Sequence, residues 1–201
     1  MKNTQLEGKR VAILATDGYE QDELLSPREA LDDAGAETKI VSLKEGKIKG
    51  WKNTDWGKSV KVDLTIEDAN PNDFDALVLP GGVMNPDHLR RNPMVLDFVK
   101  SFFTAGKPVA AICHGPWTLI DAGVVRGRKL TSYESIQTDL KNAGANWVDQ
   151  EVVVDHGLIT SRKPDDLPAF NAKLIEEISA GADNHQMSAA MAPRAETPEN
   201  N

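Results

Sequence analysis

The sequence predicts an α/β fold with a mainly parallel sheet, and two observations lead to this expectation. Short apolar runs of strand length alternate with longer segments whose apolar residues recur at helical spacing, which is the pattern of successive βαβ units. Glycine or proline stands at the ends of many of these segments, as expected for the turns between them. The 201 residues fit one domain of ordinary size, since domains contain about 100–200 residues.

The first half of the chain contains three predicted strands, two predicted helices and one irregular stretch. The apolar runs read as strands are Val11–Ala15, Lys39–Leu43 and Ala76–Leu79. The helical segments are Asp22–Ala34, which Gly35 ends, and Pro86–Ala105, within which a second helix can begin at Pro93. In Gly46–Asp63, three glycines and two tryptophans interrupt polar sequence, so we expect a β-hairpin or a structured loop there.

The second half continues the alternation. Its predicted strands are Val109–Cys113, Lys129–Ser132, Trp147–Val154 and Leu158–Ser161, and its predicted helices are Trp117–Ala122, Ile136–Ala143 and Pro164–Ser179. His156-Gly157 is expected to form a hairpin turn. We therefore predict a single domain over residues 1–180. The small and polar stretch 181–201, with its two prolines, is predicted to be a disordered tail.

Composition narrows the classes of function and location. The formal net charge of −8 argues against nucleic acid or an anionic membrane as the main partner, although a local basic patch remains open. A single cysteine excludes an internal disulfide and a multi-cysteine metal site. The histidines form no ligand pair, so neither a metal nor a cofactor is expected. No apolar run spans a membrane and no signal peptide is visible, which predicts a cytoplasmic protein.

Acidic residues, glycines, histidines and the single cysteine follow three of the predicted strands, at the points where these strands end. The three segments are Asp17–Glu23, Gly81–Leu89 and Cys113–Trp117. Open α/β sheets bind their ligands outside the carboxyl ends of the strands. We therefore expect these segments to converge at one edge of the sheet.

Cys113 is the candidate nucleophile. It ends a buried strand and is followed by His114, Gly115 and a helix, which is the order of a nucleophile elbow. The helix N-terminus favours a thiolate, and His114 can act as its base or its imidazolium partner. The alternative is that Cys113 is a small buried hydrophobic residue, as free cysteines often are, but its position at a strand end favours a reactive thiol.

Two further segments can complete the site. Gly81 or Gly82 can present a backbone N–H to an oxyanion together with the N–H of His114, although Pro-Gly-Gly by itself is only a turn. Acidic residues after the first strand suit a helix N-terminus. Among them, Glu23 can instead face the thiol, remain protonated through burial and donate a hydrogen bond to the sulfur.

Several of these segments resemble one known family. They are Asp17-Gly-Tyr-Glu-Gln-Asp-Glu-Leu24, Asp75-Ala-Leu-Val-Leu-Pro-Gly-Gly82, Gly106-Lys-Pro-Val-Ala-Ala-Ile-Cys-His-Gly-Pro116, Gly123-Val-Val-Arg-Gly-Arg128, Thr131-Ser-Tyr133 and Trp147-Val-Asp-Gln-Glu-Val-Val-Val-Asp155. With them the chain resembles the PfpI-type intracellular cysteine peptidases and general stress proteins of the ThiJ/PfpI superfamily, over about residues 9 to 180.

The resemblance implies a flavodoxin-like three-layer sandwich with helices on both faces of the sheet. It also implies Cys113 as nucleophile, His114 as its neighbour and Glu23 as the carboxyl that touches the sulfur. In PfpI-type peptidases an acid from the partner subunit, usually a glutamate, completes a triad. The matching residue here is Asp87, whose side chain is one methylene shorter. Peptidase, glyoxalase-like, deglycase, chaperone-like and redox-sensing roles occur in the family.

Three hypotheses follow for the function. The first is a stress-protection hydrolase that acts on small electrophiles, peptides or glycated adducts through the Cys113 thiolate. The second is a sensor or chaperone-like stress protein that responds to oxidation of Cys113 without turnover. The third, a glutamine amidotransferase subunit, lacks the downstream His-x-Glu pair that its chemistry needs.

We also expect a homo-oligomer, at least a dimer, with the active site near the subunit boundary. The resemblance makes the loop Val83–Arg91 the donor of Asp87 in trans. Trp51 and Trp56 lie in polar sequence, and exposed aromatic residues often mark interfaces. The alternative is that both tryptophans cover the sheet edge of a monomer.

Overall fold

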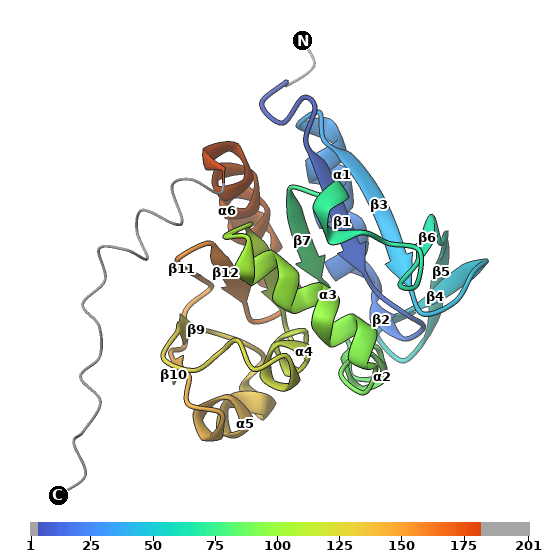
Figure 1. Cartoon of the computed structure of the whole chain (residues 1–201). Coiled ribbons are helices and arrows are strands. Elements are labelled where there is room, and N and C mark those ends of the chain that lie inside the picture. Colours follow the sequence, from blue (N-terminus) through green and yellow to red (C-terminus); the bar gives the residue numbers. More distant parts are fainter. Residues whose placement is uncertain (1–3, 182–201) are drawn as a thin grey trace, which may run out of the picture.

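The computed structural model describes residues 4–181 and is built on a seven-stranded sheet (Figure 1). The strand order is β11-β12-β8-β7-β1-β3-β6, with all pairs parallel except β11 and β12. The strands are β1 (Arg10–Leu14), β3 (Glu37–Ser42), β6 (Leu64–Thr65), β7 (Ala76–Leu79), β8 (Val109–Ile112), β11 (Val152–Asp155) and β12 (Leu158–Ser161).

Helices cover both faces of this sheet, which gives the three-layer α/β sandwich that the family resemblance implies (Figure 1). Alternate residues of β1 face opposite layers, because side chains alternate along a strand. Val11 and Ile13 pack in the core with α1 and α6, whereas Ala12 and Leu14 pack with α3, α4 and α5. The helices are α1 (Gln21–Asp33), α3 (Pro93–Thr104), α4 (Pro116–Asp121), α5 (Gln137–Asn142) and α6 (Leu167–Ala180).

Two small sheets flank the main one. The first consists of β2 (Tyr19–Glu20), β4 (Lys47–Lys52) and β5 (Asp55–Lys61), so the stretch expected to be a hairpin or a loop is a β-hairpin. The second pairs β9 (Lys129–Leu130) with β10 (Asn146–Trp147). The remaining elements are α2 (Met84–Leu89) and the 3₁₀ helices η1 (Pro71–Asp73), η2 (Glu134–Ile136) and η3 (Pro164–Asp166).

Two predicted segments are divided in the structure. The helix expected over 86–105 consists of α2 and α3, and α3 begins anew because the Asn92 side chain accepts hydrogen bonds from the backbone N–H groups of Met94 and Val95. The single strand expected at Trp147–Val154 is wrong. Trp147 pairs with Leu130 in β10, and a separate strand, β11, begins at Val152.

Other expectations on the local structure have clear outcomes. The predicted turn between β11 and β12 is confirmed, with φ of 47° at His156 and 80° at Gly157. Apart from Gly181, the predicted disordered tail lies outside the described residues, and the single domain over 1–180 stays a prediction. Within residues 4–181, no helix is long and apolar enough to cross a membrane.

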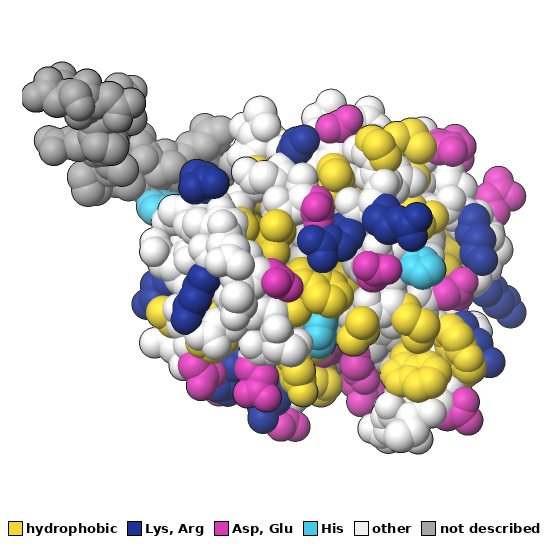
Figure 2. Space-filling view, turned by 90° about the horizontal axis from the view of Figure 1, so that it is seen from below, with side chains coloured by type: hydrophobic (Ala, Val, Ile, Leu, Met, Phe, Trp, Pro, Cys, Tyr) yellow, Lys and Arg dark blue, Asp and Glu magenta, His cyan; other side chains and the backbone are white. Residues whose placement is uncertain are grey.

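The three segments expected to converge do so, because β1, β7 and β8 are neighbours in the sheet. Their carboxyl ends open onto the lower face of the molecule in Figure 1, which Figure 2 views directly. On that face hydrophobic side chains are interspersed with acidic, basic and histidine side chains (Figure 2). The site therefore lies at the edge where an open α/β sheet binds ligands.

Candidate active site

Cys113 occupies a strained turn between β8 and α4. Its φ is 61°, a left-handed conformation that residues with a side chain rarely adopt. Two neighbouring segments hold this conformation, since the Cys113 N–H donates to the Ser161 carbonyl at the end of β12 at 3.1 Å and the Cys113 carbonyl accepts from the Tyr133 N–H at 2.9 Å. A Cβ at Gly115 would lie 2.6 Å from the Leu79 carbonyl oxygen, so the turn requires glycine there. This is the geometry of the predicted elbow.

His114 lies between the thiol and a serine hydroxyl. Its Nδ1 is 3.1 Å from Cys113 Sγ, and its Nε2 is 3.0 Å from Ser135 Oγ. The ring stacks on Tyr133, with centroids 5.0 Å apart, and meets the Trp117 ring edgewise at 5.2 Å. Burial lowers the pKa of His114, which favours the neutral imidazole that a base requires. The described part of the chain thus contains a Cys-His-Ser series.

Glu23 lies in the first turn of α1 and is fully buried. Its Oε2 accepts a hydrogen bond from the Gly81 N–H at 2.8 Å. Its carboxyl also faces the Cys113 thiol, and Oε1 has no hydrogen-bond partner among the described residues. Burial, followed by the charge of Glu20, raises the pKa of Glu23 to about 8. At neutral pH the carboxyl therefore keeps its proton, which it can donate to the sulfur.

The pKa of the Cys113 thiol is raised, contrary to the expectation that the helix N-terminus lowers it. Burial is the largest cause, and a charged Glu23 adds to it. The backbone N–H groups of Gly82 and His114 oppose the shift, because both donate to the sulfur. A protonated Glu23 carries no charge and cannot raise the thiol pKa through repulsion. Protonation of Glu23 therefore removes one cause of the raised thiol pKa, while burial, the largest cause, remains.

The two glycines at the end of β7 have different tasks. The Gly81 N–H is engaged by Glu23, whereas the Gly82 N–H faces the sulfur. Both positions exclude a side chain. A Cβ at Gly81 would lie 2.5 Å from Glu23 Oε2, and one at Gly82 (φ 78°) would lie 2.4 Å from the Gly18 carbonyl oxygen. Of the candidate oxyanion donors, the N–H groups of Gly82 and His114 are those directed at Cys113.

Asp87 does not meet the other site residues within one protomer. It lies exposed on α2, which packs against α4. Among the described residues, the ring nitrogen of His114 that faces away from the sulfur is bonded to Ser135 instead.

The other acids of the first loop have structural partners. Glu20 caps α1, since its Oε2 accepts from the Glu23 N–H at 2.8 Å. Asp17 accepts from the Lys49 N–H at 2.7 Å, and Asp22 pairs with Lys52. These contacts agree with the alternative interpretation of the acids as helix-capping and surface groups, and Glu23 alone is turned toward the thiol.

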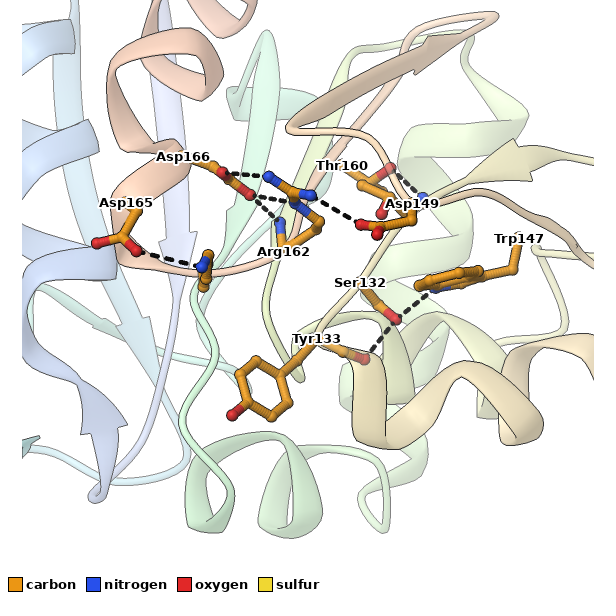
Figure 3. Close-up of polar contacts among 10 residues, drawn as sticks. Ser132, Tyr133, Trp147, Asp149, Thr160, Arg162, Asp165 and Asp166 are labelled. Atoms are coloured by element: carbon orange, nitrogen blue, oxygen red, sulfur yellow. Dashed lines mark hydrogen bonds and ion pairs between the residues drawn. The ribbon is translucent and has the colours of Figure 1, made fainter.

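A cavity of about 450 Å³ lies beside the elbow. Tyr133 belongs both to its lining and to the His114 stack. Arg162 forms another wall and is held between Asp149 and Asp166, while the Trp147 indole donates to Ser132 (Figure 3). Tyr133 thus connects the wall of this cavity with the imidazole of His114. In residues 4–181 no group of His, Cys, Asp or Glu side chains could hold a metal ion.

Comparison with known proteins identifies the family to which the chain belongs. Residues 9–177 match the DJ-1/PfpI family. The chain belongs to this family. Protein/nucleic acid deglycase 2 of Escherichia coli is 48% identical over 174 residues, which cover 86% of this chain and 99% of that protein. General stress protein 18 of Bacillus subtilis is 48% identical over 170 residues, 84% of this chain and 96% of that protein.

A solved structure extends the comparison. It is a two-domain protein from Anabaena variabilis with DJ-1/ThiJ/PfpI-like and ferritin-like domains, with a TM-score of 0.80 and 36% identity. The match covers 96% of this chain and 52% of that one. Within this DJ-1/PfpI chain, sequence reasoning missed Ser135 and the cavity. No motif marks Ser135, and the lining of the cavity comes from segments that only the fold brings together.

Proposed function

We propose that this chain is a cysteine-dependent hydrolase of the stress response that removes carbonyl adducts from amines, a deglycase. The observation that carries the proposal is the thiol of Cys113 between two proton carriers, the His114 imidazole and the Glu23 carboxyl. Such a thiol can be activated when substrate arrives without being a freely exposed thiolate beforehand. The deglycase name of a relative that is 48% identical supports this direction.

The chemistry can be written with the adduct of methylglyoxal and an amine. His114 takes the thiol proton, and Sγ forms a bond to the adduct carbon that carries the amine. The amine leaves with a proton, and a proton shift within the bound three-carbon unit gives a 2-hydroxyacyl thioester. Water cleaves the thioester, so adduct and water yield the free amine and a 2-hydroxy acid. No oxidant, reductant or metal is consumed.

Each group at the site has one task in this scheme. The N–H groups of Gly82 and His114 hold the oxygen that becomes negative. The Glu23 proton neutralises charge beside the sulfur. Ser135 fixes the imidazole at 3.0 Å and receives or returns a proton at Nε2. Small adducts can reach Cys113, which is 7% exposed.

Peptidase activity would use the same Cys113 thiol, but it would also need an acidic side chain beside His114. Among the described residues of one protomer, Ser135 occupies that position instead. The exposed position of Asp87 on α2, with Val83 and Met84 exposed beside it, supports an assembly in which a second copy adds this acid. We therefore include a homo-oligomer, with Asp87 acting in trans, in the proposal. A cytoplasmic location also belongs to it, because a free thiol persists in a reducing compartment.

The sensor hypothesis has less support from the geometry. Selective oxidation favours thiols of low pKa, whereas burial raises the pKa of Cys113.

The test uses a preformed adduct of methylglyoxal with a lysine derivative, diluted into the protein while release of free amine is followed. A parallel sample holds a chemical trap for free methylglyoxal in place of protein. We expect amine release to be faster with protein than with the trap, and Cys113→Ser to abolish the difference. The control Ser101→Ala removes a hydroxyl bonded to the Asp97 carbonyl within α3 and should retain the rate. Release no faster than with the trap would overturn the deglycase assignment.

A further inference from the structure

The β4–β5 hairpin is strongly basic, although the chain as a whole is acidic. Residues 44–61 contain six lysines and only two acids, Glu45 and Asp55, in a protein with a formal net charge of −8. The lysines are Lys44, Lys47, Lys49, Lys52, Lys58 and Lys61. The net charge that argues against nucleic acid is therefore an average that does not describe this segment.

One face of the hairpin is directed inward and the other outward. Ile48 and Val60 stand opposite each other and are buried, so the residues that alternate with them face solvent. Lys47 stands directly opposite Lys61 on this outer face, and Lys49 stands opposite Ser59. Like charges directly opposite on paired strands are destabilising. The hairpin thus maintains an unfavourable concentration of positive charge.

An aromatic pair continues the same ribbon beyond the lysines. Trp51 stands opposite Trp56, and their rings meet edgewise with centroids 5.4 Å apart. The Lys49 ammonium lies 5.9 Å from the centre of the Trp56 ring. Trp56 is 45% exposed, so one of its faces remains open to a ligand.

Most of the lysines are free to bind an anion. Lys44 and Lys52 pair with Asp17 and Asp22. Among the described residues, Lys47, Lys49, Lys58 and Lys61 form no ion pair. A shallow hollow lined by Glu45, Asp63 and Asp68 adjoins Lys61, so the positive charge is concentrated toward Lys49 and Trp56.

We propose that the outer face of the β4–β5 hairpin binds single-stranded nucleic acid, with phosphates on Lys47 and Lys49 and a base stacked on Trp56. Lysines at alternate positions of a strand lie about 7 Å apart, and single-strand binders combine such a positive track with aromatic stacking platforms. Phosphates would also neutralise the opposed pair Lys47 and Lys61.

Two other occupants fit the observations less well. A symmetric contact with a second copy would set this lysine face against itself, which repels. An acidic peptide would satisfy the lysines but would leave the exposed face of Trp56 without a stacking partner. The position of the hairpin also suits a substrate strand, because β4 pairs with β2, where Trp51 stands opposite Glu20, three residues before Glu23.

The test is fluorescence anisotropy of a labelled oligothymidylate with the full chain, repeated between about 50 and 200 mM salt. We expect binding that weakens with salt. Trp56→Ala should raise Kd by about fivefold or more, as loss of one stacked base predicts, and Trp56→Phe should retain part of the affinity. Lys47→Gln with Lys49→Gln should raise Kd and lower the salt slope by about one to two.

The controls separate this proposal from the proposed enzymatic function and from general charge effects. Cys113→Ser should bind the oligonucleotide as the native chain does, whatever its activity. Lys100→Gln with Lys173→Gln removes the same charge from surface positions paired with acids on α3 and α6 and should leave Kd unchanged. Three results would each overturn the proposal. They are absence of binding at low salt, equal losses in the control, or a polyglutamate peptide that competes fully while Trp56→Ala has no effect.

Discussion

The active site and the β4–β5 hairpin both contact β2, through the bond from the Glu20 N–H to the Gly81 carbonyl and through the pairing of β4 with β2. The two regions nevertheless handle charge in opposite ways. At the elbow, ionisable groups are removed from water, so burial raises the pKa values of Cys113 and Glu23 and lowers that of His114. In the hairpin, lysines remain exposed to water and repel one another. Buried groups exchange protons at close range, which suits bond making, whereas solvated charges attract an extended anion.

Loss of the nucleophile is the largest expected effect on the elbow. Cys113→Ser should lower kcat/KM for adduct cleavage by at least about 10³-fold, because a serine hydroxyl is far harder to deprotonate. Steady-state kinetics on the preformed adduct measure the change. Oligonucleotide affinity in the same preparation should stay constant. A variant that keeps more than a tenth of the native rate would place the chemistry elsewhere.

The second prediction concerns the proton on Glu23. Glu23→Leu removes both the acceptor for the Gly81 N–H and the donor to the sulfur, so we expect about a 10²-fold loss of kcat. Glu23→Gln keeps an acceptor and a donor in the same shape and should lose less than about tenfold at pH 7. A loss of less than about tenfold in Glu23→Leu as well would show that the carboxyl proton has no part in the reaction.

The third prediction follows from the pKa of about 8 at Glu23. Above that pH the native carboxyl ionises, its charge raises the thiol pKa, and kcat/KM should fall, whereas Glu23→Gln should not show this decline.

Stability should change over the same pH range. A carboxyl whose pKa rises from 4.5 to about 8 on folding stabilises the native state fully below pH 4.5 and loses that contribution as the pH approaches 8. The free energy of unfolding should fall over this window by on the order of 5 kcal/mol relative to Glu23→Gln. Urea titrations at several pH values measure it, and parallel pH profiles for both proteins would contradict the assignment.

A smaller effect is expected at Ser135. Ser135→Ala removes the hydroxyl bonded to His114 Nε2 and should lower kcat by about tenfold, with little change in unfolding free energy because the residue is exposed in η2. Ser135→Thr should restore part of the rate. If Asp87 of a second copy serves His114 instead, Asp87→Ala will lower the rate more than Ser135→Ala does.

The smallest expected effect on stability concerns a substitution in the β4–β5 hairpin. Lys47→Glu converts a like-charge pair into an opposite-charge pair across from Lys61, so it should stabilise the fold by about 0.2–1 kcal/mol. The same variant should weaken oligonucleotide binding. Thermal unfolding and anisotropy together test both directions, and destabilisation would contradict the described register.

Much of the fold could be predicted from sequence because β1, β7 and β8 are short apolar runs that lie in the core, where periodicity is reliable. The prediction of a single strand over Trp147–Val154 failed for a physical reason. Its apolar residues serve two different sheets, and pattern alone cannot show where a chain leaves one partner for another.

The candidate site could be predicted at Cys113 and Gly115, because the order of residues along the chain alone indicates the turn between strand and helix. Glu23 was one of four acids in a single loop, and only burial beside Gly81 distinguishes it. Ser135 is 21 residues from its partner His114 and follows no motif. The rise in the thiol pKa was also missed, because a helix N-terminus is visible in sequence whereas desolvation depends on the whole fold.

The aromatic contacts of His114 have a kinetic consequence. Because the imidazole is stacked on Tyr133 and meets Trp117 edgewise, it cannot swing out to exchange protons with bulk water and return. A proton that enters at Nδ1 therefore either returns to the substrate from Nδ1 or leaves at Nε2, with the ring in place. The histidine then works as a fixed relay with two ports, one on the substrate side and one on the side of Ser135.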